Sequence, residues 1–234
     1  MRDNDIITTV QQKQAVLFDL FHTLTRVESS WLAGPSTAEI LGVSKEAWNE
    51  QVMEKSRDRL TGKIIDPVLI IRQMAHLIDP AIPESFIKKA VSNRIKRFYA
   101  AVVNIPQETR QVLTNLKSIN KKIGLISNAD VTEIIGWKRS GIAHLFDSVV
   151  FSCKAGCVKP EPRIYNISME ELGVEPGDCL FVGDGGSREL EGAKRLGITT
   201  VIITGVISEL WPDKIEERKQ YADYVIERLS ELVM

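Results

Sequence analysis

The stretch "AVLFDLFHTLT", residues 15–25, places one carboxylate directly after an apolar run. A continuous apolar run of this length favours a strand that is covered on both faces, as in a parallel sheet. Asp19 ends the run, and Phe21, His22 and Thr23 follow it. Because parallel α/β sheets bind ligands beyond the carboxyl ends of their strands, we expect Asp19 to face a ligand pocket.

Past residue 100, short apolar and β-branched runs alternate with helical patterns. This alternation predicts an α/β fold with a doubly wound parallel, Rossmann-like sheet. One helical pattern begins at Asp130, has Glu133 as the partner of a capping box, and closes at Gly141. Further strands are predicted at 121–128, 146–152, 179–184 and 199–205, with an edge strand at 221–226.

The segment between the first strand and this series differs, because residues 26–103 are helical in composition and carry few strand signals. We therefore predict a core made of residues 1–25 and 104–234, with an inserted α-helical cap at 26–103. Since the insert leaves the sheet just after Asp19, it would cover the pocket as a lid. Trp31 is a candidate for the entrance between cap and core. Four arginines of the predicted cap would either contact an anionic substrate or lie on solvated helix faces. They are Arg57, Arg59, Arg94 and Arg97.

The composition is that of an ordinary globular chain. Its 234 residues carry a net charge of -1, which gives no bulk attraction to nucleic acid or to a membrane. No apolar window approaches ~20 residues, and the N-terminus has no visible secretory signal. The odd cysteine count argues against a disulfide framework and fits a reducing compartment. We expect a cytoplasmic protein with a small-molecule, anionic substrate, and the sequence does not indicate its oligomeric state.

Several predicted strands end on polar residues. Together with one lysine, these residues form a set of motifs that follow one another in a fixed order along the chain. In this set the chain resembles the haloacid dehalogenase (HAD) superfamily, and the place of the insert resembles that of its helical-cap branch. The resemblance implies a hydrolase with a Rossmann-like core. The matching segments are "DLFHT" from Asp19, "GLISN" with Ser127, "CVKPEPRIY" with Lys159, and "GDGGSREL" with Asp184 and Glu189.

The resemblance also implies roles for these residues. Asp19 would be the nucleophile that forms a covalent aspartyl intermediate. Ser127 would donate a hydrogen bond to a phosphoryl or carboxylate oxygen of the substrate, with Asn128 and Thr23 beside it. Lys159 would balance the clustered carboxylates and orient Asp19.

A Mg²⁺ ion is implied in the same way. Asp184 and Glu189 match the metal carboxylates of the family, although Glu189 replaces the usual Asp. Asp19 and the backbone carbonyl of Phe21 would complete the ligand set. Mg²⁺ prefers hard oxygen ligands of this kind.

Phe21 is the departure from the pattern, because family phosphatases carry at this position an Asp that transfers a proton. General acid–base help is worth roughly 10²–10⁴-fold, so the loss matters. His22 stands next to Phe21, and we expect a loop or cap-facing role for it rather than catalysis.

Alternative functions therefore stay open. The favoured one is a Mg²⁺-dependent phosphatase that acts on a small phosphorylated metabolite without the second Asp. A metal-independent 2-haloacid dehalogenase is the enzyme alternative, since those enzymes resemble this chain in carrying an aromatic residue here and release a halide without a proton. The spacing of Asp184 and Glu189 favours the metal-dependent members. A catalytically weak binding or regulatory protein is the remaining alternative.

Overall fold

The structure, a computed structural model, describes residues 3–27, 30–54 and 56–233. Its centre is a six-stranded sheet in the order β3-β2-β1-β4-β5-β6, in which all paired strands run parallel. This confirms the α/β fold with a parallel, Rossmann-like sheet. The strands are β1 Ala15–Phe18, β2 Lys122–Ser127, β3 Ser148–Phe151, β4 Cys179–Gly183, β5 Thr199–Ile203 and β6 Tyr224–Ile226.

Strand β1 lies between β2 and β4, and all its residues are buried, as its unbroken apolar run predicts. Phe18 is in register with Leu125 of β2 and Val182 of β4. The ladder continues one residue further, because the N–H of Asp19 donates to the carbonyl of Val182 at 3.0 Å. Asp19 is thereby fixed at the carboxyl edge of the sheet's central strands.

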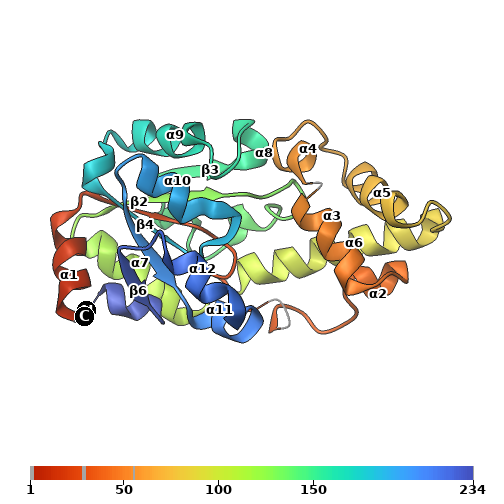
Figure 1. Ribbon diagram of the computed structural model, residues 1–234, viewed down its shortest axis with the longest axis horizontal. Coiled ribbons are helices and arrows are strands. Elements are labelled where there is room, and N and C mark those ends of the chain that lie inside the picture. Colours follow the sequence, from red (N-terminus) through yellow and green to blue (C-terminus); the bar gives the residue numbers. More distant parts are fainter. Residues whose placement is uncertain (1–2, 28–29, 55, 234) are drawn as a thin grey trace.

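Helices cover both faces of this sheet (Figure 1). Helix α7 packs against β2 on one face, beside α1 and the short 3₁₀ turn η7 at Leu229–Leu232. Helices α9 and α10 cover the other face. The α-helices are α1 Asp3–Gln12, α2 Thr37–Leu41, α3 Lys45–Glu54, α4 Arg57–Leu60, α5 Pro67–Ile78, α6 Glu84–Val103, α7 Gln107–Ser118, α8 Ser152–Ala155, α9 Pro162–Leu172, α10 Glu189–Arg195, α11 Gly205–Leu210 and α12 Ile215–Lys219.

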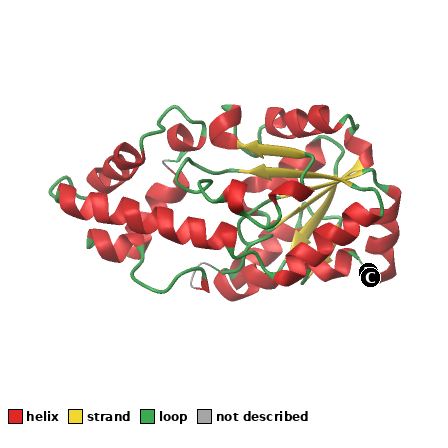
Figure 2. Ribbon diagram, turned by 180° about the vertical axis from the view of Figure 1, so that it is seen from behind, coloured by secondary structure: helices red, strands yellow, loops and turns green. Residues whose placement is uncertain are grey.

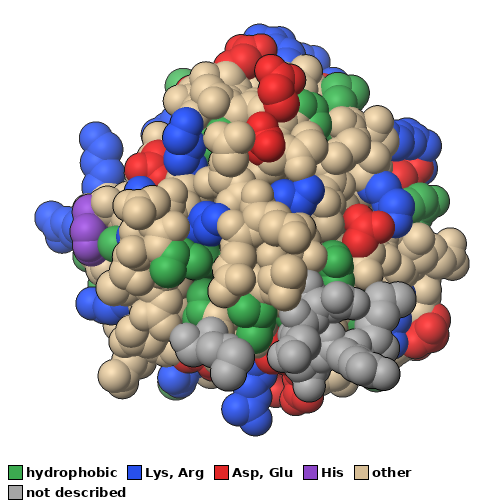
Figure 3. Space-filling view, turned by 90° about the vertical axis from the view of Figure 1, so that its left-hand side faces the viewer, with side chains coloured by type: hydrophobic (Ala, Val, Ile, Leu, Met, Phe, Trp, Pro, Cys, Tyr) green, Lys and Arg blue, Asp and Glu red, His purple; other side chains and the backbone are tan. Residues whose placement is uncertain are grey.

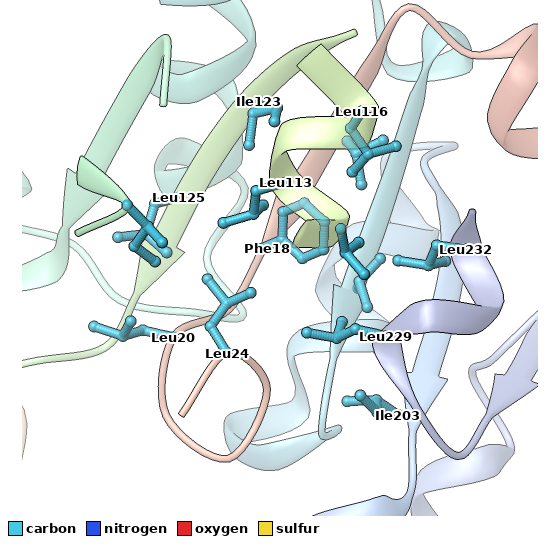
Figure 4. Packing of buried hydrophobic residues seen from close by; sticks show 14 of the residues in the cluster. Phe18, Leu20, Leu24, Leu113, Leu116, Ile123, Leu125, Ile203, Leu229 and Leu232 are labelled. Carbon is cyan, nitrogen blue, oxygen red and sulfur yellow. The ribbon is translucent and has the colours of Figure 1, made fainter. Parts of the chain in front are cut away.

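The packing under α7 follows from the sequence spacing. Val112, Leu113 and Leu116 repeat at helical intervals, and all of them are buried. Figure 4 shows Leu113 and Leu116 beside Phe18 of the central strand, with Leu229 and Leu232 of η7 closing the cluster. Burial of such side chains contributes roughly 1.5–3 kcal/mol each, so this layer stabilises the strand that carries Asp19.

Helices α2, α3, α5 and α6 enclose a separate buried cluster that includes Trp48, Ile71 and Ile87. Figure 2 shows this group extending away from the sheet, on the side toward which the arrowheads of the upper strands point. Helix α6 belongs to both parts, because Ile87 lies in the cap cluster and Val102 in the core cluster. The boundaries of the cap at residues 26 and 103 stay a prediction.

One predicted helix is wrong. Residues 131–140 form turns and a short 3₁₀ segment, η2 Trp137–Arg139, instead of the helix expected from Asp130 to Gly141. Half of the expected capping box does form, because the N–H of Asp130 donates to Glu133 at 2.7 Å. However, the Asp130 side chain forms ion pairs with Arg59 and Arg94, two buried arginines of the cap.

The surface at the α1 end, opposite the cap helices, is mixed in charge. Figure 3 shows Lys and Arg side chains interspersed with Asp and Glu on this face, in keeping with the near-zero net charge. None of the helices among the described residues has the length and apolarity needed to cross a bilayer.

Candidate active site

Asp19 and Glu189 are joined by one lysine at the carboxyl edge of the sheet. The Lys159 ammonium donates to Asp19 Oδ1 and to Glu189 Oε2, at 2.5 Å each. All of these side chains are buried, and the Thr23 hydroxyl donates to the other Asp19 oxygen at 3.3 Å. Both oxygens of Asp19 are therefore held in place.

Asp184 completes the carboxylate group. Its Oδ1 accepts the N–H of Gly186 at 2.8 Å, and its Oδ2 accepts from Arg218 at 3.0 Å. Glu189 Oε1 likewise accepts a backbone N–H, from Gly185, at 2.9 Å. One oxygen from each of Asp19, Asp184 and Glu189 lies within 4.8 Å of the others.

The pKa values of these groups are displaced by burial and by each other. Burial raises the pKa of Glu189 to about 8, and the charges of Asp19 and Asp184 act in the same direction. Burial and Asp184 also raise the pKa of Asp19, against the opposing charge of Lys159. For Lys159, burial alone would lower the pKa, but its two carboxylate partners outweigh burial and raise it. Lys159 therefore stays charged and acts as a fixed cation rather than as a proton donor.

The residues fit a hard metal ion. Carboxylate oxygens are the ligands that Mg²⁺ prefers, and the three present here converge within one ligand shell. Each carboxylate accepts hydrogen bonds, but a carboxylate has about four lone-pair sites and can also bind a metal. A second observation points to a ligand: the buried hydroxyl of Ser127, at the end of β2, has no hydrogen-bond partner among the described atoms.

Asn128 and Lys159 are locked together through the backbone. The Lys159 N–H donates to the Asn128 side-chain oxygen at 2.8 Å, and the Asn128 amide donates to the Lys159 carbonyl at 3.1 Å. This reciprocal pair fixes the loop that presents the lysine ammonium to Asp19. Asn128 thus contacts the Lys159 backbone, and its contact with substrate stays a prediction.

Phe21 lies in an aromatic cluster between core and cap. Its ring centroid is 5.1 Å from that of Phe98 on α6 and 5.8 Å from that of Trp31. The His22 ring stacks on Trp31 at 6.1 Å and meets the edge of Trp211 at 5.2 Å. His22 Nδ1 also lies 4.0 Å from an Asp184 oxygen. The position two residues after Asp19 is thus occupied by an aromatic ring that packs among other rings.

The cap arginines differ from the prediction in two cases. Arg59 and Arg94 are buried and paired with core carboxylates, so they do not lie on a solvated helix face. Arg59 donates to Asp130 at 2.7 Å, and Arg94 donates to Glu133. Outside this network, Arg57 pairs with Glu161 at the surface, and Arg97 donates to the carbonyl of Leu32.

Titration of the network follows from the same contacts. Burial would raise the pKa of Asp130, but Arg94 and Arg59 outweigh it and hold the pKa below its usual value. Burial and the charge of Asp130 raise the pKa of Glu133. The arginines therefore act mainly as counter-ions of Asp130.

The sequence motifs did not identify Arg218 and Trp211. Both lie in the C-terminal part of the chain, Trp211 directly after α11 and Arg218 on α12, where no motif or predicted element drew attention. The alternation of charged residues in "DKIEERKQ" resembles that of a solvated helix, so sequence alone gave no signal for Arg218.

Comparison with known proteins gives a family match. The family model described as haloacid dehalogenase-like hydrolase matches residues 13–197. A glyceraldehyde 3-phosphate phosphatase of Methanocaldococcus jannaschii is 32% identical over 129 residues, which are 53% of this chain and 53% of that protein. The chain thus spans about half the length of these phosphatase relatives.

Dehalogenases match over a longer span. The (S)-2-haloacid dehalogenase 4A of Burkholderia cepacia is 26% identical over 233 residues, covering 87% of this chain and 95% of that protein. The structure of an L-2-haloacid dehalogenase from Xanthobacter autotrophicus superposes with a TM-score of 0.63 at 21% identity, covering 94% of this chain and 96% of that one. At this identity the likeness is one of fold.

Proposed function

The chain belongs to the haloacid dehalogenase-like hydrolases, and from this premise we propose that it is a phosphatase of a small phosphorylated metabolite. The observation that carries the proposal is the buried group of Asp19, Asp184 and Glu189 carboxylates within 4.8 Å of one another. Such a group suits phosphoryl transfer with a metal ion, whereas a haloacid dehalogenase needs none. The relatives named as glyceraldehyde 3-phosphate phosphatases support the same reaction class.

In the proposed reaction, Asp19 attacks phosphorus and the bond between phosphorus and the leaving oxygen breaks. The electron pair of that bond goes to the leaving oxygen, and Asp19 becomes an aspartyl-phosphate. Water then cleaves this intermediate to phosphate and restores the carboxylate. Lys159 and Thr23 keep the Asp19 oxygens oriented, and the Ser127 hydroxyl is available to donate to a phosphoryl oxygen.

Asp19, Asp184, Glu189 and the backbone carbonyl of Phe21 would hold Mg²⁺. When bound, the ion supplies positive charge that offsets the repulsion between the Asp19 carboxylate and a phosphoryl group. Phe21 supplies no proton for the leaving oxygen. Substrates whose leaving group is stable as an anion are therefore expected to react fastest.

A 2-haloacid dehalogenase is the second candidate. Two observations favour it: the Burkholderia cepacia relative matches along 95% of its own length, and Phe21 offers aromatic surface where a phosphatase would carry an acid. In this reaction Asp19 would attack the carbon that bears the halogen, the carbon–halogen bond would break, and halide would leave without a proton. The resulting aspartyl ester would be hydrolysed by water.

Assays with p-nitrophenyl phosphate test the proposal, because its leaving group needs little protonation. We expect Mg²⁺-dependent hydrolysis that is lost in EDTA and falls at least about 10³-fold in Asp19→Asn, which removes the nucleophile. Asp213→Asn, at an exposed position of the C-terminal segment, is the matched control and should keep full activity.

Other outcomes separate the alternatives. Phosphate release that survives both EDTA and Asp19→Asn contradicts the proposed mechanism. Chloride release from 2-chloropropionate in EDTA identifies a dehalogenase. Tight ligand binding without turnover of either substrate class points to a binding or regulatory protein.

A further inference from the structure

Arg218 of α12 contacts the loop that carries Asp184, at two points. Its guanidinium donates to Asp184 Oδ2 and to the Asp184 backbone carbonyl, at 3.0 Å each. The Arg218 side chain is only 16% exposed and that of Asp184 9%. In this setting solvent screens the ion pair far less than it screens a pair on the open surface.

The surroundings of Arg218 match its side chain. The Trp211 ring lies under the guanidinium, with 5.3 Å between the ring centroid and Cζ. Gly185 lies against its aliphatic part, where a Cβ would come within 2.8 Å of Arg218 Cβ. Gly185 also has a φ of +80°, which favours glycine. Side chain, ring and glycine together form a defined seat for one arginine.

Arg218 adds a positive charge beside the three carboxylates of the site. Each carboxylate of the acidic group already contacts a fixed cation, Lys159 for Asp19 and Glu189, and Arg218 for Asp184. We propose that Arg218 is an internal counter-ion of Asp184 that positions this carboxylate and weakens the binding of a divalent metal ion at the site. The inference rests on the proposed metal-dependent function, because it concerns the affinity of the same carboxylates for a metal.

Electrostatics give the direction and the size of the effect. A unit positive charge a few ångströms from a divalent cation opposes its binding, and at this range the effect is on the order of tenfold even with water-like screening. The same contact stabilises the metal-free site, since an unpaired buried Asp184 would repel Asp19 and Glu189. An anionic substrate would offset the charge of Arg218, so the metal would be held more tightly with substrate than without it.

Titration with Mn²⁺ alone, followed by calorimetry, tests the inference on the full chain. Arg218→Gln removes the charge and keeps hydrogen-bond donors, so we expect its Kd for Mn²⁺ to fall on the order of tenfold. Arg218→Lys keeps the charge and should stay within about threefold of the parent chain. Lys219→Gln, which removes a charge from the next position of α12, is the matched control and should change nothing.

Thermal unfolding in EDTA gives a second readout. Arg218→Gln should melt below the parent chain without metal, and saturating Mn²⁺ should close that gap. A merely structural role of Arg218 would lower the Tm equally in both conditions. If Arg218→Gln does not fold, Trp211→Leu is the substitute. It removes the ring under the Arg218 guanidinium and keeps all charges, so the arginine is held less firmly and Mn²⁺ binding should tighten about threefold.

The outcomes separate this inference from the proposed function. If the parent chain binds Mn²⁺ and the Kd of Arg218→Gln is unchanged or larger, only the role of Arg218 is overturned. An unchanged Kd in Trp211→Leu has the same meaning where that variant is needed. Binding by Arg218→Gln but not by the parent chain supports the inference in its strongest form. Binding by none of the variants overturns both the inference and the metal-dependent function.

Discussion

Phe21 connects the edge of the sheet that carries Asp19 to the cap. Its ring meets Phe98 of α6 edge-on at 5.1 Å, and the Arg94 guanidinium lies 4.5 Å from the centroid of the same Phe98 ring. Aromatic pairs of this geometry contribute roughly 0.5–1.5 kcal/mol beyond the area they bury. A carboxylate in this position would lose that contact and would face an apolar surface. Phe21 thus contributes cap–core packing that an acid at this position would not provide.

This packing predicts the behaviour of Phe21→Asp. We expect the free energy of unfolding to fall by about 1–3 kcal/mol, because a half-buried ring is replaced by a carboxylate. At the same time hydrolysis of an alkyl phosphate should rise relative to p-nitrophenyl phosphate by about tenfold or more, since a proton donor is introduced. The ratio of the two kcat/KM values is the measurement.

Phe21→Leu is the matched control, because it removes the ring without adding an acid. It should lose stability and leave the ratio of rates unchanged. An equal change of the ratio in both variants would show that packing, and not proton transfer, controls the choice of leaving group.

At the residue scale, the sequence predicted that Asp19, Ser127 and Asp184 converge, because each ends a predicted strand of the parallel sheet. Strand order and the carboxyl edge are enough to bring such positions together. Lys159 and Glu189 were added to this group only by the resemblance of their motifs to those of the family. The sequence did not predict Arg218, because the contact depends on how α12 folds back over the loop after β4. Such long-range placement leaves no local pattern.

At the scale of elements, the loop after β2 and the cap helices α4 and α6 share a buried ion network. Arg59 and Asp130 lie 2.7 Å apart, with exposures of 6% and 0%. Arg94 contacts Glu133 and donates to the Thr132 hydroxyl at 3.2 Å. Breaking a buried ion pair on one side costs about 3–5 kcal/mol, because the remaining charge is left without a partner. The network therefore ties the cap to the loop that begins at Ser127 and Asn128.

We predict that Arg94→Met lowers the free energy of unfolding by about 3–5 kcal/mol, as measured by urea denaturation. Arg94→Met leaves Asp130 and Glu133 with Arg59 alone, so one carboxylate charge is unpaired. Glu133→Gln removes that charge, so in the double variant part of the loss should be recovered. If the double variant is no more stable than Arg94→Met, the loss comes from packing rather than from the unpaired charge.

The same loop explains why one predicted helix was wrong. The local signals of a helix start and end are Asp130, Glu133 and Gly141. Of the contacts they predict, only the hydrogen bond from the Asp130 N–H to Glu133 forms. The deciding contacts come from Arg59 and Arg94, which lie tens of residues earlier in the chain. A pattern read over a dozen residues contains no information about such partners.

At the scale of the whole molecule, the alternation of strands and helices was enough to predict the sheet. Every predicted strand past residue 100 contains an observed one, including the edge strand β6. The placement of the cap on the core was not predictable, because it depends on contacts between side chains far apart in sequence. One such contact is very close: a Cβ on Gly62 would lie 2.0 Å from the carbonyl oxygen of Cys153.

Cys153 should therefore report how firmly the cap lies on the core. Burial raises the pKa of its thiol to about 11, and the charges of Asp130 and Glu133 add to the effect. Because the thiolate is the reactive form, only about one thiol in a thousand is reactive at pH 8. We expect slow labelling by a disulfide reagent at pH 8, with a rate that increases as the pH rises toward 11.

Arg59→Met removes a cap contact of Asp130 and should let the cap lift from α8, which carries Cys153. As burial decreases, the pKa of Cys153 should fall toward its usual range, and labelling at pH 8 should accelerate by about tenfold for each unit of the fall. Cys153→Ser gives the background rate from Cys157 and Cys179, which are both buried. Rapid labelling of Cys153 in the parent chain at pH 8 would mean that the cap does not rest on the core in solution. The close approach of Gly62 to Cys153 would then describe only one of several cap positions.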